Sequence, residues 1–234
     1  MLANVAKPPA RPILLDLEQF ESIEDALGKI QLTRAFDHLA GEILGSFIDL
    51  GGRPTLLSFF FMSAVARARG LREAAVREIE AQCPPAAATL LRQLAEVVAT
   101  IFYVADFPEY AEAIAFRPDE ARPGAPKRKG VQALIHHMDR HHADQFEVVY
   151  ADLNEMTHFN SAAMWSSHTS GDDGGVRWSS APRWKNEHDP FIFCATLLEL
   201  TAGVNTALVH LGHTLVRTVT DPKPAERWVT RPLG

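Results

Sequence analysis

Apolar residues recur at helical spacing along most of the chain. The first such pattern opens at Ser22, with Asp25 three residues later, and its apolar positions are Leu27, Ile30, Leu39, Ile43, Leu44, Phe47 and Ile48. A serine followed at this distance by an acidic residue is typical of a helix N-terminus, and the pair Gly51-Gly52 is typical of a helix end. The pattern predicts one capped amphipathic helix between these two signals.

Prolines and glycines divide the next part of the chain into further helices. The stretch "PTLLSFFFMSAVARARG" predicts a helix that ends at Gly70, followed by a shorter helix, "LREAAVREIEA", that ends before Pro84-Pro85. "AAATLLRQLAEVVATIFYVADF" predicts a helix that ends before Pro108, and "PEYAEAIAF" predicts a short one. The first half of the chain is therefore predicted to be all helical.

Two more helices are predicted at about 130–143 and 145–159. Asp144 separates them, because its side chain can cap the second helix while Glu147, three residues on, completes a capping box. The segment 117–130 before them is rich in proline and glycine, and it predicts a mobile loop.

The longest apolar segment, "FIFCATLLELTAGVNTALVHLGHTLV", follows Asp189-Pro190 and is predicted to end near Arg217. On a helical wheel one face is wholly apolar, which predicts the central core helix; that face holds Phe193, Leu197, Leu200, Val204, Leu208, Leu211 and Leu215. No membrane span is expected, because polar residues interrupt the segment.

Between residues 162 and 184 the helical spacing gives way to two short alternating stretches around the turn-rich "TSGDDGG", which predict a β-hairpin. Its tryptophans, Trp165, Trp178 and Trp184, are expected to cover neighbouring helices. The predicted fold is thus an all-α multi-helix bundle with a small β-hairpin insertion before the last long helix. A single domain is expected over 14–217, with a flexible tail at 1–13 and a second tail at 218–234.

Composition narrows the setting and the partners. The chain has 234 residues, of which 47% are hydrophobic, so it can bury a sizeable core. Only two cysteines occur, far apart, and prolines interrupt the N-terminal segment where a signal peptide would need an apolar run, so a cytoplasmic protein is expected. A net charge of −6 argues against general DNA binding, because such binding requires cations that neutralise phosphates.

Four histidines crowd the stretch "IHHMDRHHAD" at 135–144. The wheel predicts that His142 faces the interior, that His137 lies nearly opposite, and that His136 and His141 lie on the flanks. The four should therefore not converge, and three of them are interpreted as the solvated end of a helix, where partial protonation complements the helix dipole.

A divalent metal is the one cofactor that the residue pattern suggests. Glu199, His210 and His213 share a stripe of the last helix, but Glu199 and His210 are three turns apart and cannot bind the same ion. His210 and His213 remain candidates, with ligands from elsewhere, as does the inward-facing His142. The same stripe holds Ala195, Ala202, Thr206 and Arg217, and small residues alternate with polar ones along it. This pattern is consistent with a homodimer interface, which we expect, with the wall of a polar cleft, or with a face exposed to water.

Candidate catalytic residues lie on two earlier helices. Tyr150, Asn154 and His158 form an i, i+4 row at the edge of an apolar face, and Glu155-x-x-His158 matches half of a di-iron motif. This row can line a groove or hydrogen-bond to neighbouring backbone. Arg92 and Glu96, also at i, i+4, can form an ion pair that braces Tyr150 or His158 from a facing helix, in a network that specifies packing or takes part in catalysis.

Two of these stretches resemble those of uncharacterised bacterial helical proteins of the HEPN-like type. They are Arg92-x-x-x-Glu96 running into Phe102-Tyr103-x-x-Asp106, and Tyr150-x-x-Leu153-Asn154-x-x-x-His158; the resemblance covers roughly 85–217. Within that family the second stretch usually has serine at the position of Asn154 and proline at that of Phe159. The resemblance also implies an Arg-x(4–6)-His ribonuclease motif, which here is matched by Arg183-x4-His188 in the loop before the last helix.

Three functions follow as hypotheses. The first is a non-enzymatic or accessory helical module that acts through protein or RNA contacts. The second is a metal-dependent or HEPN-type hydrolytic enzyme, with a His/Glu site between the long helices or with Arg183 and His188 as the RNA-cleaving pair. The third is a bundle that binds a small ligand in an aromatic pocket formed by the three hairpin tryptophans.

Overall fold

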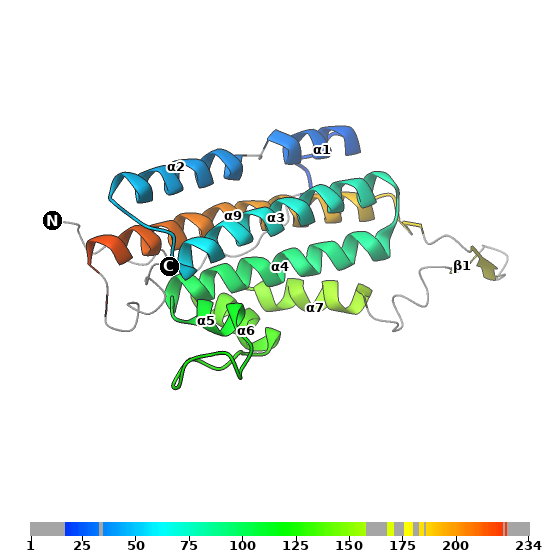
Figure 1. Ribbon diagram of the computed structural model, residues 1–234. Helices are drawn as coiled ribbons and strands as arrows, with labels where there is room; N and C mark the ends of the chain where they lie inside the picture. Colours follow the sequence, from blue (N-terminus) through cyan, green and yellow to red (C-terminus); the bar gives the residue numbers. More distant parts are fainter. Residues whose placement is uncertain are drawn as a thin grey trace.

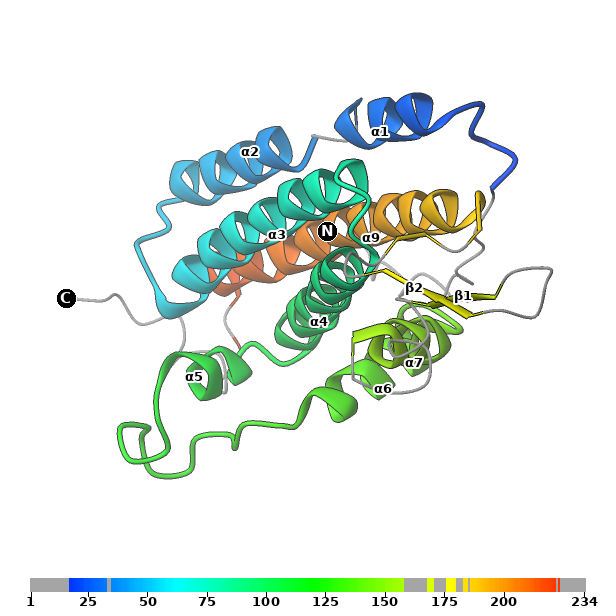
Figure 2. The same ribbon diagram turned by 90° about the vertical axis from the view of Figure 1, so that its right-hand side faces the viewer.

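Helices dominate the computed structural model, which describes residues 17–32, 35–157, 168–170, 176–179, 183–184, 186–221 and 223. Helix α9 (Asp189–Thr220) packs against α4 (Pro84–Asp106) and α3 (Leu56–Glu80) to form the centre of the bundle. Helices α1 (Ile23–Leu32) and α2 (Ala35–Asp49) lie along α9 on one side (Figures 1 and 2). Helices α6 (Val131–His141) and α7 (Phe146–Thr157) cover α4 on the other, beside the short α5 (Tyr110–Ala115). The predicted all-α bundle is confirmed.

The core face of α9 is as predicted. Each of the seven apolar residues assigned to it is buried, from Phe193 to Leu215. Helix α4 is equally apolar, and its buried residues include Leu91, Leu94, Val98 and Ile101. These two helices therefore supply the frame on which the others pack.

Two helix boundaries differ from the prediction. The pattern from Ser22 to Ile48 forms two helices, α1 and α2, rather than the one predicted. Its two ends are as expected: Ser22 Oγ accepts a hydrogen bond from Asp25 N at 3.1 Å, and Gly51, at φ +81°, follows the end of α2. Helix α3 runs through Gly70 without a break. The reason is that the buried positions Ala68 and Leu71 on either side of this glycine keep the helical spacing of the core face.

The start of α7 is capped by a residue other than the predicted one. Asp144 accepts a hydrogen bond only from the adjacent Gln145 N, at 3.1 Å, among the contacts described for it. Asp139 in α6 accepts from Glu147 N at 3.1 Å and takes the role expected of Asp144. The turn between the helices is tight, with Gln145 at φ +65°, and it brings Asp139 close enough to cap α7.

The segment predicted as a hairpin is described only in part. β1 (His168–Ser170) and β2 (Val176–Trp178) pair antiparallel, with Thr169 opposite Arg177. Trp165 lies outside the described residues. Trp184 packs edge-on against Phe193, with ring centroids 4.7 Å apart, whereas Trp178 is 69% exposed and covers no helix, contrary to expectation. The described tryptophans therefore do not form an aromatic pocket together.

The C-terminal end of the predicted domain shifts slightly. Helix α9 continues to Thr220, three residues beyond the predicted limit at Arg217, because Leu215 and Thr218 are still buried against the bundle. At the other end the described residues begin at Leu17, inside the predicted domain, and Phe20 is buried. The predicted tail at 1–13 lies outside the described residues.

The loop 117–130 has no regular secondary structure, and α5 holds it at two points. The buried Glu112 accepts from Arg122 N at 3.1 Å and pairs with the Arg122 guanidinium at 3.0 Å. Near the other end of the loop, Lys129 N donates to Tyr110 Oη at 2.9 Å. These contacts place Arg128 and Lys129 beside α5, while the mobility of the loop stays a prediction.

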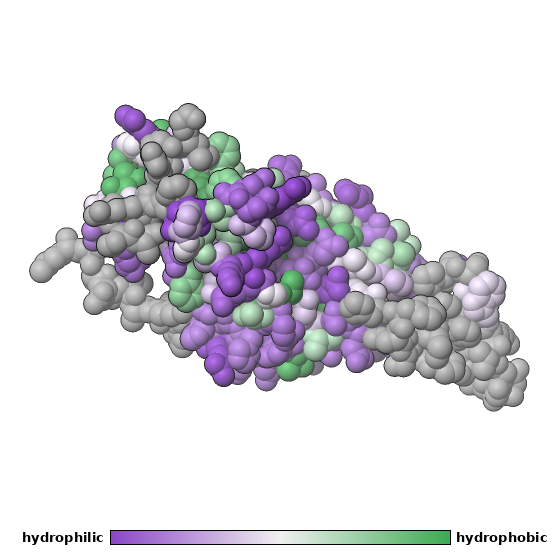
Figure 3. Space-filling view, turned by 60° about the horizontal axis from the view of Figure 1, so that its bottom comes forward, coloured by the Kyte–Doolittle hydropathy of each residue, from purple (hydrophilic) through white to green (hydrophobic). Residues whose placement is uncertain are grey.

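Among the described residues, α4 and α9 are long and apolar enough to cross a membrane by length and composition. The core helix of a soluble protein meets the same criteria. Of the most apolar window in each, 56% is buried inside the bundle, and the face that carries α5, α6 and α7 is largely hydrophilic (Figure 3). A core role accounts for both helices, and the expected cytoplasmic location stays a prediction.

Replacing each of two glycines by alanine tests the packing of α2 on α9. Gly70→Ala should raise the free energy of unfolding by about 0.5–1 kcal/mol, because a β-carbon there meets no atom within 4 Å and alanine favours the helix. Gly212→Ala should lower it by about 1–3 kcal/mol, because its β-carbon would lie 2.8 Å from Ile43 Cγ2 of α2. Urea unfolding of both variants measures the difference. Equal effects of the two substitutions would contradict the packing of α2 on α9.

Candidate metal centre

Three histidines converge on the carboxylate of Asp106, the last residue of α4. His137 Nε2 and His142 Nε2 each lie 2.8 Å from Asp106 Oδ2, and His210 Nε2 lies 2.9 Å from Oδ1. The histidines come from the body of α6, from its C-terminal cap and from α9. Both carboxylate oxygens are thus engaged where three helices meet.

The register of α4 against α9 is fixed next to this cluster. Thr214 Oγ1 donates to the carbonyl oxygen of Ala105 at 3.0 Å, which joins the last turn of α4 to α9. His210 lies one turn before Thr214 on α9, and Asp106 follows Ala105 on α4. The single hydrogen bond therefore aligns the two residues that meet across the helices.

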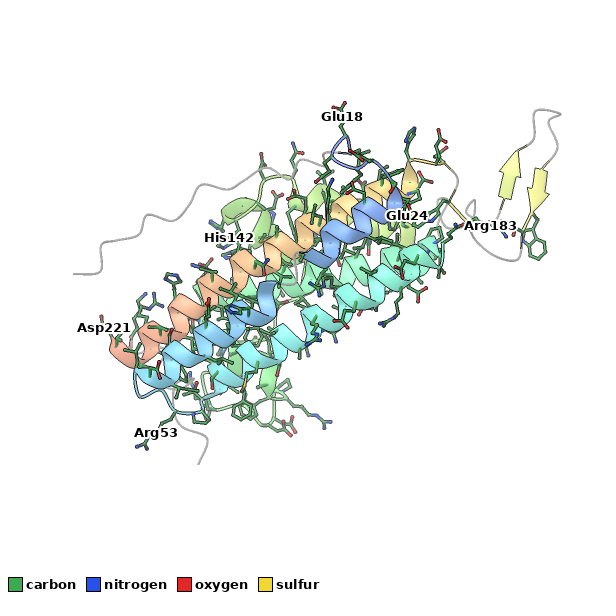
Figure 4. All side chains as sticks on the ribbon, turned by 90° about the horizontal axis from the view of Figure 1, so that it is seen from above. Glu18, Glu24, Arg53, His142, Arg183 and Asp221 are labelled. Carbon is green, nitrogen blue, oxygen red and sulfur yellow. The ribbon has the colours of Figure 1, made fainter. Side chains whose placement is uncertain are left out.

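Helix α6 supplies its two histidines in different ways. His137 belongs to the helix and packs edge-on against Tyr103, with ring centroids 5.0 Å apart. His142 caps the helix at φ −131° and ψ −39°, so its side chain leaves the helical path and stacks on Phe102 at 4.1 Å. Figure 4 shows His142 beside α9, where its ring lies 5.7 Å from that of His210.

The cluster keeps Asp106 ionised. Burial raises the pKa of this carboxyl, but the hydrogen bonds with His137, His142 and His210 together outweigh burial and hold the pKa well below its usual range. The Asp106 side chain is 16% exposed and that of His142 is 5% exposed, so little water screens the negative charge. An anionic oxygen with two imidazole nitrogens beside it is a set of ligands that suits a divalent cation.

Asp106, His137 and His142 form the tightest group. One ligand atom from each lies within 4.8 Å of the others, as metal coordination requires, and His210 bonds the opposite carboxylate oxygen instead. Histidines that hold a ligating carboxylate in this way commonly orient it for the metal. The geometry thus fits two histidine ligands and one carboxylate ligand, with His210 behind the carboxylate.

The sequence located half of this cluster. His142 faces inward and His210 contacts a residue of another helix, but His213 is exposed and is not part of the cluster. The sequence did not indicate that Asp106 and His137 belong to it. The interpretation of His137 as a solvated residue was wrong, because the end of α4 packs against that flank of α6 and buries His137 to 13% exposure.

Glu199 lies apart from the cluster but near one of its residues. It lines a cavity of about 110 Å³ together with Phe102, His142 and Thr206. The predicted dimer stripe on α9 is also divided, since Ala195 is buried in the core and His210 turns toward Asp106. Its members therefore do not form one continuous surface, and the homodimer stays a prediction.

The predicted network around Arg92 and Glu96 is present. Arg92 Nη1 donates to Asn154 Oδ1 at 3.1 Å, and Arg92 Nε lies 3.7 Å from Glu96 Oε1. Tyr150 Oη donates to the same Glu96 oxygen at 3.0 Å. Burial and this hydrogen bond raise the pKa of Tyr150 to about 12, so the phenol remains protonated and the network joins α4 to α7 without an activated group.

The remaining candidates lie elsewhere. His158 is outside the described residues, and Glu155 is exposed. Arg183 and His188 are both exposed, and Figure 4 shows Arg183 at the hairpin end of the bundle, away from His142. Burial raises the pKa of the Cys194 thiol to about 12, so this cysteine is not an activated nucleophile.

Comparison of the chain with known protein families, curated proteins and solved structures finds no match. The protein is therefore described by its structure alone. It is an all-α bundle with a cluster of three histidines and one aspartate at the junction of α4, α6 and α9.

Asp106→Asn tests the electrostatics of the cluster. We expect it to lower the free energy of unfolding at neutral pH by on the order of 2 kcal/mol, because hydrogen bonds to charged groups are worth about 1.5–3 kcal/mol each. Since the folded-state pKa is lowered, this stabilisation is complete above the unfolded pKa of about 3.9 and is lost as the pH falls through the folded pKa.

Urea unfolding should therefore show the wild type and Asp106→Asn approaching each other in stability once the pH falls below about 4. The control is Asp152→Asn on the exposed side of α7, which should change stability little at any pH. A difference between wild type and Asp106→Asn that stays constant below pH 4 would contradict the assigned ionisation.

Proposed function

We propose that Asp106, His137 and His142 bind a divalent metal ion and that the protein is a metal-dependent hydrolytic enzyme. One observation carries the proposal: two imidazole nitrogens from α6 lie 2.8 Å from the same carboxylate oxygen of α4. Two histidines and one carboxylate occur as ligands in catalytic zinc sites and in non-haem iron(II) sites. Zinc is the ion expected first, because it needs no redox partner.

To accept the ion, His137 and His142 must each give up the Nε2 proton that bonds Asp106, and the distances must change a little. Ligands of a tetrahedral zinc ion, bound at about 2.0–2.1 Å, are separated from one another by roughly 3.3 Å. The two Nε2 to Oδ2 distances of 2.8 Å must therefore open by about 0.5 Å. Small rotations of the two imidazole side chains are enough for such a change. His137 lies in the last two turns of α6 and His142 is its C-terminal cap, so the helix itself need not move.

Three protein ligands leave a coordination position open. A metal in such a site supplies acidified bound water, with a pKa near 7 in known zinc enzymes. Here His210 holds the far oxygen of Asp106 and is itself 36% exposed, so the cluster has an edge toward solvent. The cavity that His142 shares with Glu199, of about 110 Å³, has room only for water or a very small substrate.

Zinc titration of the full chain tests the assignment and ranks the residues. His137→Ala and His142→Ala should abolish stoichiometric binding, whereas His210→Ala should weaken it about 10–100-fold, as loss of a residue behind a ligand does. His213→Ala, on the same helix but exposed, is the matched control and should bind like wild type. Zinc at 100 times its dissociation constant should stabilise the fold by about 2.7 kcal/mol.

Calorimetric titration and metal analysis of dialysed protein give these values. Stoichiometric binding that survives His137→Ala and His142→Ala would place the metal elsewhere. The absence of stoichiometric binding by the wild type would remove the metal centre and the hydrolytic function with it.

The open coordination position has its own test. Azide added to the cobalt(II)-loaded protein should change the visible absorption spectrum, because the anion enters the coordination sphere of the metal. If His210 were a fourth ligand that closed the site, the spectrum would not respond. The comparison is the cobalt(II)-loaded His210→Ala variant. Its spectrum should respond to azide whether or not His210 is a ligand in the wild type, because the position is open in this variant.

A second candidate function is the non-enzymatic module that acts through protein contacts. Its support is four exposed apolar side chains on either side of the turn between α2 and α3, namely Ile48, Leu50, Phe59 and Met62. Exposed apolar residues mark interaction sites where they form a contiguous patch. On this hypothesis the Asp106 cluster braces three helices without a metal, so the zinc titration separates the two functions.

A further inference from the structure

A second cavity lies between α3, α4, α5 and the start of α6. Its volume is about 360 Å³, within the usual range for small-molecule sites. The cavity shares no lining residue with the Asp106 cluster. Its chemistry therefore has to be explained separately.

The lining divides into an apolar body and a cationic rim. Phe60, Ile101, Ile114 and Leu134 contribute apolar surface from four different helices. Arg67 from α3, with Arg128 and Lys129 from the loop before α6, brings positive charge, and all three are exposed. A molecule with an apolar part and an anionic group matches both regions.

The one carboxylate that lines the cavity is already engaged. Glu96 accepts from Tyr150 Oη at 3.0 Å and lies 3.7 Å from Arg92 Nε, so its charge is largely compensated from the α7 side. Three cations thus face the cavity against one compensated anion. Within the described part of the chain, Arg128 and Lys129 form no ion pair with a carboxylate, and Arg67 bonds the neutral side chain of Gln93 at 3.4 Å.

One of the two loop cations, Lys129, is held in place. Lys129 N donates to Tyr110 Oη, and the Lys129 ammonium group lies 5.7 Å from the centroid of the Tyr103 ring. Tyr110 itself lines the cavity and is buried. The backbone anchor therefore fixes the position of the rim, which lowers the entropy cost of binding an anion there.

We propose that this cavity binds a small organic anion, with an aromatic or aliphatic body between Phe60, Ile101 and Leu134 and a carboxylate, sulfonate or phosphate group at Arg67, Arg128 and Lys129. The apolar lining supplies affinity, and the rim selects the charge. The inference does not depend on metal binding at Asp106.

Two fluorescent probes of the same shape test it. 8-Anilinonaphthalene-1-sulfonate carries an anionic group, and N-phenyl-1-naphthylamine is the same framework without it. Fluorescence titration of the metal-free full chain should show tighter binding of the sulfonate, by about tenfold, which corresponds to about 1.4 kcal/mol. The preference should shrink at 1 M salt, because the rim is exposed and screening is strong there.

Variants place the probe in the cavity. Arg128→Gln and Lys129→Gln should each weaken sulfonate binding several-fold and leave binding of the neutral probe unchanged. Arg53→Gln, an exposed arginine in the loop between α2 and α3, is the control with the same change of charge and should have no effect. Ala64→Leu, which adds bulk to the buried wall of the cavity, should weaken both probes.

Equal affinity for the two probes would overturn the charge selection. Sulfonate binding that is unaffected by Arg128→Gln, Lys129→Gln and Ala64→Leu would overturn the site. Circular dichroism of each variant shows whether it remains folded, and retained binding of the neutral probe by the two charge variants shows that the cavity itself is intact.

Discussion

The structure depends on one carboxylate at the end of α4. Asp106 accepts hydrogen bonds from histidines on α6 and α9, so a single side chain joins three helices that are far apart in sequence. A buried charge is costly unless it is well paired, and here three imidazoles compensate it. The histidines that make the carboxylate tolerable in the bundle include those proposed to share a metal ion with it, so on that proposal stability and chemistry depend on the same atoms.

The surroundings of the carboxylate are built to keep it in place. Thr214 of α9 donates a hydrogen bond to the last turn of α4, which aligns His210 with Asp106. Phe102 stacks on His142, and Tyr103 packs against His137. Further along α4, Arg92 and Glu96 reach across to α7. Helix α4 thus presents two polar clusters about three turns apart on a largely buried helix, and each cluster attaches a different peripheral helix.

The sequence predicted the helices well because apolar spacing is a local signal. The seven core positions of α9 followed from its helical wheel, and the end of α4 followed from Pro108. The Arg92–Glu96 pair followed from its i, i+4 spacing, and its contact with Tyr150 was one of the two alternatives predicted. The Asp106 cluster did not follow from the sequence, because its members meet only when α6 docks on the end of α4. His142 also leaves the helical path, so the wheel could not place it beside His137. Asp106 had nevertheless been noted in the sequence, as the last residue of the stretch Phe102-Tyr103-x-x-Asp106 that carries the family resemblance. The two aromatic residues of that stretch pack against His142 and His137.

Helix α6 is short, and its two ends contact different sites. Val131 at its first turn lines the 360 Å³ cavity, and His137 and His142 at its other end meet Asp106. An 11-residue helix is a nearly rigid rod of roughly 16 Å, so a shift imposed at one end is carried to the other. A single short helix therefore contributes to the wall of the cavity at one end and to the Asp106 cluster at the other.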